Sequence, residues 1–302
     1  MTTHKYVQAL FACVMLCIVA FVAPAVNAEA NIEKHKRGSL IIVGGGDTPY
    51  TIQKRFVELA GGAGRARIAI FPMAATEYDE EADEVLAEFT WLGAETVILN
   101  MNREQAQSSS MDATLSGFTG YWFLGGDQNV LAASLLGTRA LRTIEFQYEK
   151  GAVVGGTSAG AAVMTATMLT GERRTASGRI NEDPNAVALR STEVTLGFGL
   201  LPGAIIDQHF SRRSRDNRLV SAVLDHPQLL GVGIDEETAL VVRPDGRWDV
   251  LGNGHVKIYD ARRAYIVNED NDMVGASGIR MHVLPRGSRF DPKLGQLGSW
   301  RN

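Results

Sequence analysis

Short apolar runs that end in glycine-rich turns recur along this chain of 302 residues. The clearest, residues 152–154, leads into Gly156-Thr157-Ser158-Ala159-Gly160, and small residues suited to a helix follow. Glycines at 156 and 160 would let a strand and a helix approach more closely than side chains allow. The pattern predicts a strand, a sharp turn and a helix, with the Ser158 hydroxyl projecting from the turn as a nucleophile would.

The other apolar runs alternate with helical patterns in the first half of the chain. Strands are predicted at 39–43, 67–71, 95–99, 120–124 and 152–154. Helices are predicted at 50–59 and 79–92, from the turn at 125–128 to 135, and at 138–150. This alternation predicts an α/β fold with a doubly wound, mostly parallel sheet. Hairpin turns at 244–246 and 252–254 then separate short strands, which we expect to be antiparallel strands added to the sheet edge.

Three glycine turns, 44–47, 125–128 and 155–160, each follow a predicted strand. Because parallel strands end at the same edge of a sheet, and ligands bind beyond that edge, the three turns predict one shared site there.

The first 28 residues have the pattern of a secretion signal. Lys5 supplies positive charge, residues 9–23 are apolar, and Val26-Asn27-Ala28 ends in small residues suited to cleavage. The apolar run is short for a membrane span, which takes about 20 residues. We expect a secreted or periplasmic protein with a flexible arm at 29–38 and one catalytic domain at 39–302; an uncleaved anchor is the alternative.

Composition restricts the chemistry of the mature chain. Cys13 and Cys17 both lie in the predicted signal, so neither a disulfide nor a thiol nucleophile is expected after cleavage. The net charge is −4, and removing residues 1–28 takes away Lys5 and no acid, which gives −5. This charge argues against nucleic acid as a partner. No spacing of metal ligands occurs, so neither a metal nor a cofactor is expected.

A serine nucleophile needs a base, and His209 is the candidate. It follows residues 204–208, a predicted strand with a polar end, so we expect it at the same sheet edge as Ser158. His35 lies in the charged arm, and His226, His255 and His282 lie at a helix end, in a hairpin turn and in the tail.

The base in turn needs an orienting acid. The apolar run 230–234 ends in Asp235-Glu236, again at the predicted edge, and Glu236 is our choice. The acids that compete with it are Asp235, Asp207, Glu172 and Glu182. The order serine, histidine, acid differs from that of α/β-hydrolases, where the acid precedes the histidine, so another topology is expected.

Basic residues follow His209 closely: Arg212, Arg213, Arg215 and Arg218. Arginines beside a catalytic base could bind anionic groups of a substrate. The simpler explanation is a solvated helix face, because Asp216 and Asp225 are near in sequence. Residues 171–190 are polar and irregular, and we expect a long surface loop there, over or near the site.

Four motifs, in this order, give the chain a resemblance to a known family. They are Gly125-Gly126-Asp127-Gln128, residues 155–164 around Ser158, Asp207-Gln208-His209-Phe210 with the arginines that follow, and Gly233-Ile234-Asp235-Glu236. Over residues 39–260 the chain resembles the cyanophycinases, serine peptidases of the family that also contains aspartyl dipeptidase. The resemblance implies a flavodoxin-like, glutamine-amidotransferase-like fold and a homodimer. It also implies cleavage of cyanophycin, a poly-aspartate whose β-carboxyls carry arginine, into β-aspartyl-arginine.

The resemblance also implies roles for individual residues. Ser158 matches the nucleophile, His209 the base and Glu236 the third member of the triad. Gly126 and Ala159 match the donors of the oxyanion hole. Positions that line the family's substrate pocket are matched by Gln128, Asp207, Arg213, Arg215 and Arg218. The loop at 171–190 is longer than in the intracellular members, and the tail after residue 262 matches no motif.

Three other functions remain open. The chain could be an aspartyl or isoaspartyl dipeptidase acting on small peptides, or a catalytically silent binding protein of the same fold. Nucleotide binding at 44–47 is the third, although that turn lacks the Gly-x-Gly-x-x-Gly spacing and no P-loop lysine follows it.

Overall fold

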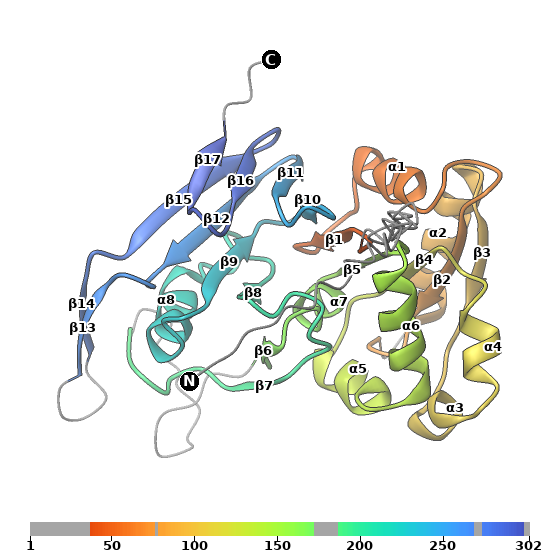
Figure 1. The fold of residues 1–302 in the computed structure, drawn as a ribbon, viewed down its shortest axis with the longest axis horizontal. Helices are drawn as coiled ribbons and strands as arrows, with labels where there is room; N and C mark the ends of the chain where they lie inside the picture. The colour runs from red at the N-terminus through yellow and green to blue at the C-terminus, as the bar shows by residue number, and fades with distance from the viewer. Residues whose placement is uncertain (1–36, 76–77, 172–186, 269–273, 299–302) are drawn as a thin grey trace, which may run out of the picture. The chain divides into compact units, whose positions relative to one another are not determined.

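Five parallel strands, β1 to β5, form one side of a nine-stranded sheet (Figure 1). The structure is a computed structural model that describes residues 37–75, 78–171, 187–268 and 274–298. Across the sheet the strands are β17 (Gln296–Gly298), β16 (Arg289–Asp291), β11 (Trp248–Gly252), β10 (Thr238–Val242), β1 (Leu40–Val43), β5 (Val153–Thr157), β4 (Gly120–Phe123), β2 (Arg67–Phe71) and β3 (Glu95–Ile98). The strands from β1 to β3 are parallel, and those from β10 to β17 continue the sheet antiparallel.

The continuous apolar runs are explained by burial on both faces of the parallel strands. In β1, Leu40 and Ile42 belong to one hydrophobic cluster, and Ile41 and Val43 belong to another. Helices α1 and α2 contribute to the second cluster, and α3 to α6 contribute to the first. The helices are α1 (Tyr50–Leu59), α2 (Tyr78–Trp91), α3 (Arg103–Gln107), α4 (Met111–Leu115), α5 (Gln128–Leu135), α6 (Arg139–Glu149), α7 (Ala159–Ala162) and α8 (Asp216–Asp225). The predicted doubly wound α/β class is therefore confirmed.

The strands that lead to His209 and Glu236 do not extend that sheet, which corrects our expectation. They form a second, four-stranded sheet in the order β15 (Arg280–Pro285), β12 (His255–Asp260), β9 (Leu230–Ile234) and β8 (Ala204–Asp207). Within it β8 and β9 are parallel, and β12 is antiparallel to both β9 and β15. Two-stranded sheets pair β13 (Tyr265–Asn268) with β14 (Val274–Ser277), and β6 (Thr167–Leu169) with β7 (Val194–Leu196).

Helix α8 packs on the second sheet through its own small core. Leu219 and Val223 of the helix lie in one hydrophobic cluster with residues of the sheet and of the loop after β8. These are Ile205 of β8, Tyr259 of β12 and Phe210, which follows His209. Glycines in β9 make the close approach possible: a Cβ at position 231 would lie 2.3 Å from the Val223 side chain. This packing holds the ends of β8 and β9 side by side.

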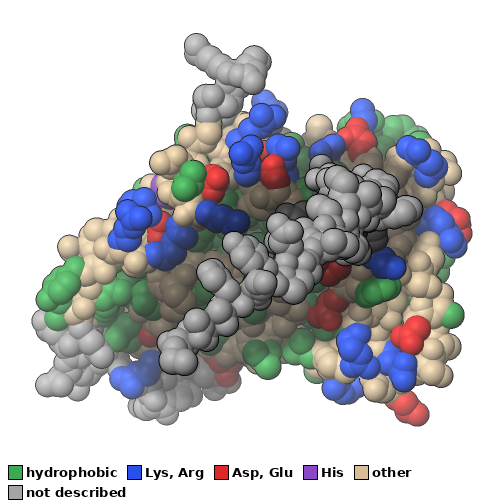
Figure 2. All heavy atoms as spheres, in the orientation of Figure 1, with side chains coloured by type: hydrophobic (Ala, Val, Ile, Leu, Met, Phe, Trp, Pro, Cys, Tyr) green, Lys and Arg blue, Asp and Glu red, His purple; other side chains and the backbone are tan. Residues whose placement is uncertain are grey.

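The described residues belong to one compact unit, residues 35–302. The predicted signal, most of the predicted arm and residues 172–186 of the predicted loop lie outside the described part. None of the described helices combines the length and the apolar character needed to cross a bilayer. On the face shown in Figure 2, acidic and basic side chains of the described residues stand next to one another.

Candidate active site

Ser158 occupies the sharp turn between β5 and α7. Its backbone has φ 52° and ψ −108°, a conformation that L-residues rarely adopt and that costs about 1–3 kcal/mol. The flanking glycines are required by contact: a Cβ at Gly160 would lie 2.2 Å from the Phe123 carbonyl oxygen, and one at Gly156 2.7 Å from the Gly160 carbonyl oxygen. The predicted strand, turn and helix are therefore present, although the helix is only four residues long.

His209 and Glu236 join Ser158 in a single chain of hydrogen bonds. The Ser158 hydroxyl lies 2.8 Å from His209 Nε2, and His209 Nδ1 lies 2.7 Å from Glu236 Oε1. The side chain of His209 is 13% exposed and that of Glu236 is 34% exposed. With the ring proton on Nδ1, donated to Glu236, Nε2 is free to accept the serine proton. The structure thus brings together the three residues that the sequence singled out from three distant segments.

The glycine turn after β1 is the surface on which this histidine lies. A Cβ at Gly45 would lie 2.2 Å from His209 Cε1, and one at Gly46 3.1 Å from Glu236 Cβ. The Gly44 carbonyl accepts from the His209 amide at 2.6 Å, and the Gly45 carbonyl accepts from the Glu237 amide at 2.9 Å. The turn therefore connects the nine-stranded sheet to the ends of β8 and β9.

The electrostatic setting of His209 favours the neutral imidazole. Burial lowers its pKa below the usual value, and the positive charges of Arg213 and Arg215 lower it further. The hydrogen bond to Glu236 and that residue's charge oppose this effect. A neutral imidazole at neutral pH can act as a general base, which is the state that serine activation requires.

The two predicted oxyanion donors, Gly126 and Ala159, lie in different turns. Ala159 follows Ser158 at the start of α7, and Gly126 has φ 123° in the turn after β4. A Cβ at Gly126 would lie 2.0 Å from the Ala74 carbonyl oxygen, which accepts from the Asp127 amide at 2.9 Å. Asp127 also caps α5 by accepting from the Asn129 amide at 2.8 Å. In the turns and loops that the structure describes, neither Gly126 nor Ala159 donates its N–H to a backbone carbonyl, so both remain available to an oxyanion.

The predicted pocket residues are divided between a buried cluster and the surface. Asp207 is fully buried and pairs with Arg215 Nη1 at 3.0 Å and Arg218 Nε at 3.1 Å. Arg215 also donates to the Gln208 backbone carbonyl at 2.7 Å and to its side-chain oxygen at 2.8 Å. Complete burial raises the pKa of Asp207, and the two guanidinium groups oppose that rise. Arg213 is exposed, outside this cluster.

Gln128 and Arg218 hold the end of β6 and the residues that follow it. Gln128 donates to the Leu169 carbonyl at 2.8 Å, and Arg218 donates to the Gly171 carbonyl at 3.0 Å. Both side chains are almost wholly buried, at 5% and 4% exposure. These two predicted pocket residues therefore fix the chain just before residue 172, where the described part breaks off.

The competing acids that the structure describes, Asp235 and Asp207, have other partners. Asp235 accepts from the Ser211 and His255 amides, each at 3.1 Å, so it fixes the chain after His209 and does not touch the imidazole. Asp207 lies in the buried cluster, and Glu172 and Glu182 lie outside the described residues. The described part holds no group of three metal-ligating side chains.

Two residues at this site were given no role from the sequence. Gln208 lies between Asp207 and His209 and ties Arg215 to this segment through its carbonyl and amide oxygens. Glu81 of α2 lies beside the Gly125 turn, which also borders Ser158. Glu81 is one of several acidic residues on α2, and nothing in the local sequence distinguishes it from the others. Its contact with Gly125, 44 residues later, depends on tertiary packing.

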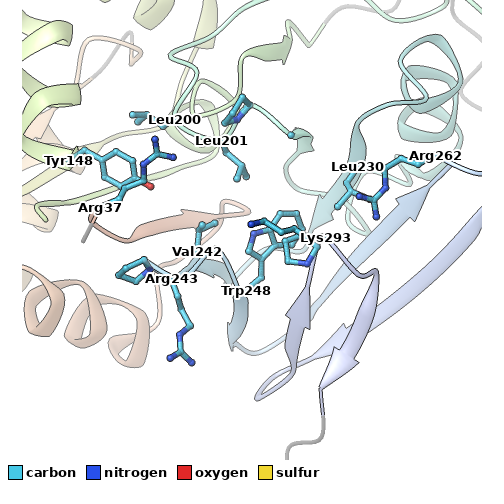
Figure 3. Close-up of a pocket in the computed structure, with 15 residues that line it drawn as sticks. Arg37, Tyr148, Leu200, Leu201, Leu230, Val242, Arg243, Trp248, Arg262 and Lys293 are labelled. Carbon is cyan, nitrogen blue, oxygen red and sulfur yellow. The ribbon is translucent and has the colours of Figure 1, made fainter. Parts of the chain in front are cut away.

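A separate cavity of about 290 Å³ lies at the opposite ends of the strands (Figure 3). Its lining includes Leu230, Val242 and Trp248, at the start of β9, the end of β10 and the start of β11. Val242 pairs with Leu40, the first residue of β1, whereas the triad lies beyond its last residue, Val43. No member of the triad lines this cavity.

Comparison with known proteins agrees with this geometry. Residues 39–247 match Peptidase family S51. The cyanophycinase of Nostoc sp. is 36% identical over 276 residues, covering 88% of this chain and 89% of its own. That of Geminocystis herdmanii is 33% identical over 275 residues, covering 88% and 97%. A solved peptidase from an acI-B1 Actinobacterium has the same fold, with a TM-score of 0.63, 24% identity and coverage of 85% and 98%. The chain therefore belongs to peptidase family S51 and is a serine peptidase.

Proposed function

We propose that this protein is an exported cyanophycinase, a serine-type exopeptidase that hydrolyses cyanophycin to β-aspartyl-arginine dipeptides. The observation that carries the proposal is the continuous hydrogen-bonded chain from Ser158 through His209 to Glu236, in a member of family S51. Relatives that are 36% and 33% identical to this chain over the aligned residues bear the name cyanophycinase.

The acylation step uses the triad and the two turn amides. His209 Nε2 takes the Ser158 proton while the serine oxygen attacks an aspartyl backbone carbonyl, and Glu236 stabilises the resulting imidazolium. The N–H groups of Gly126 and Ala159 bind the oxyanion, each contributing about 3–4 kcal/mol of transition-state stabilisation. The imidazolium then gives its proton to the leaving amine as the carbon–nitrogen bond breaks.

Deacylation repeats the same steps with water. His209 removes a proton from the water molecule, which attacks the acyl carbon, and Ser158 leaves as it regains the proton. Because the triad is part of one strained turn and two strand ends, its members are positioned before the substrate binds.

The arginines have different parts in substrate recognition. We infer that Asp207, Arg215 and Arg218 shape the wall of the pocket, because their charges are already paired inside the protein. Arg213 is exposed, and it lies close enough to His209 to lower the imidazole pKa. It is the arginine best suited to bind a substrate carboxylate.

The experiment compares chain 29–302 with its Ser158→Ala variant on insoluble cyanophycin. Released products are identified by mass spectrometry. We expect β-aspartyl-arginine from the unaltered chain and a loss of at least about 10⁴-fold in rate for the variant. Circular dichroism of the variant should match that of the unaltered chain, because alanine keeps the Cβ of Ser158 and removes only its hydroxyl.

Other outcomes are equally informative. Cleavage of short aspartyl peptides without attack on the polymer would favour the dipeptidase. Binding without cleavage of either would favour a silent binding protein, and full activity of Ser158→Ala would overturn the serine mechanism. Export is tested separately by determining the N-terminus of the protein from expressing cells, where Glu29 is expected.

A further inference from the structure

Helix α2 brings a carboxylate to the Gly125 turn, which also borders the nucleophile. A Cβ at Gly125 would lie 3.5 Å from Ser158 Cβ, 3.8 Å from Glu81 Oε1 and 4.0 Å from Ser158 Oγ. Glu81 and the serine hydroxyl therefore border the same small space above the Gly125 turn. That turn also supplies Gly126, the predicted oxyanion donor, so this is the space that a substrate must enter.

The Glu81 carboxylate has no cationic partner among the described residues. Their ion pairs do not include it, and the charge of Glu84 on the same helix repels it. Although Glu81 is exposed as a whole, burial of its carboxyl end raises its pKa, while a hydrogen bond from the Gly125 backbone lowers it. A carboxylate in this position would be stabilised by a positively charged ligand.

Charges of both signs therefore lie along the triad. The charge of Arg213 acts on His209, the middle member of the triad, and Glu81 lies at the Gly125 turn, which borders Ser158. Each repeating unit of the proposed substrate also carries both signs, because its arginine has a free carboxylate and a guanidinium group. A guanidinium forms a planar, paired contact with a carboxylate, which is stronger and more directional than a contact with a neutral amide.

We propose that Glu81 binds the guanidinium group of a substrate arginine next to the scissile bond, and so selects substrates that carry arginine. This inference rests on the proposed function. The competing explanation is structural: Glu81 would only accept from the Gly125 amide and shape the turn. The two explanations differ because a structural role affects every substrate equally.

The test uses two synthetic trimers, one of β-aspartyl-arginine and one with citrulline in place of arginine. Citrulline has nearly the same shape but carries no charge. For the unaltered chain we expect kcat/KM to be about 10–100 times higher with arginine, the range for one hydrogen-bonded charge pair. Glu81→Gln should lose this factor on the arginine trimer and keep its rate on the citrulline trimer within about twofold.

Glu80→Gln is the matched control, because Glu80 is exposed on the same helix and no hydrogen bond or ion pair of its side chain occurs within the described residues. It should keep the preference for arginine. Equal loss on both trimers, or no loss on either, in Glu81→Gln would overturn the inference. An unaltered chain that cleaves both trimers equally would overturn it and leave the proposed function standing. Cleavage of neither trimer nor the polymer would overturn both.

Discussion

The triad and the buried charge cluster are two polar networks at the end of one strand, and they differ in what burial does to them. Asp207, at the end of β8, is completely buried between two guanidinium groups, at 3.0 and 3.1 Å. His209, two residues later, is partly exposed and has a neutral serine on one side and a carboxylate on the other. The charges of the buried cluster are paired with one another inside the protein, whereas the triad is open to a substrate. Asp207 therefore fixes the structure at the end of β8, and His209, two residues later, takes part in the reaction.

This comparison predicts that breaking the triad affects rate and breaking the cluster affects folding. The largest effect on rate, apart from loss of the nucleophile, should come from Glu236→Gln. Without the carboxylate, His209 loses the partner that holds Nδ1 protonated and stabilises the imidazolium, so kcat should fall by about 10⁴-fold. The free energy of unfolding should change little, because Glu236 is 34% exposed. Turnover of the polymer and urea unfolding measure the two quantities.

Glu237→Gln is the matched control for this variant. Glu237 is the next residue, and its carboxylate accepts from Asn253 at 2.8 Å, a bond that glutamine can also accept. Its kcat should stay within about twofold of the unaltered value. If Glu236→Gln kept its activity, the acid of the triad would have to come from residues outside the described part, such as Glu172 or Glu182.

The largest effect on folding should come from Asp207→Asn. This change leaves Arg215 and Arg218 positively charged and buried without their anion, so the free energy of unfolding should fall by about 3–5 kcal/mol. The control is Glu58→Gln, which removes an exposed ion pair with Arg55 at 3.2 Å and should cost less than about 1 kcal/mol. Equal unfolding free energies for the two variants would contradict the stabilising role of the cluster.

The nucleophile turn and the parallel strands could be predicted from sequence because their causes are local. The predicted strands 67–71 and 120–124 coincide with β2 and β4 to within one residue. Uninterrupted apolar runs of this length are stable only when both faces are covered, and the two hydrophobic clusters cover them. Glycines at 156 and 160 are needed because carbonyl oxygens occupy the places of their side chains.

The second sheet could not be predicted, because an apolar run predicts burial but not the strand that it pairs with. Residues 204–207 and 230–234 were expected at the edge of the parallel sheet, yet β9 pairs with β8 and β12. The relevant signal was Gly231 and Gly233, which make room for Val223 and Phe210. Glycines within a strand indicate close packing, but the sequence alone does not name the partner.

The position of the base was predicted for a reason that is only partly correct. His209 does lie at the edge where Ser158 lies, but it arrives there from the second sheet. The Gly44–Gly46 turn makes this possible, since a side chain on Gly45 would occupy the place of the imidazole. The turn was expected at the site, whereas its function as a support for the base needs coordinates.

The smallest of the predicted effects is a shift in pH dependence caused by Arg213, whose charge acts on both Asp207 and His209. The positive charge of Arg213 lowers the pKa of His209, so Arg213→Gln should raise that pKa. Activity appears as His209 loses its proton, and the acid limb of kcat/KM against pH should therefore move to higher pH. The shift should be a fraction of a unit, because Arg213 is exposed.

Arg212→Gln is the control, since Arg212 is also exposed but is not among the charges that act on His209. A shift of the Arg213→Gln acid limb to lower pH, or an equal shift in the control, would contradict a direct effect of the Arg213 charge on His209. Added salt should narrow the difference between the two variants, because it screens exposed charges and leaves the buried pairs of Asp207 almost unaffected.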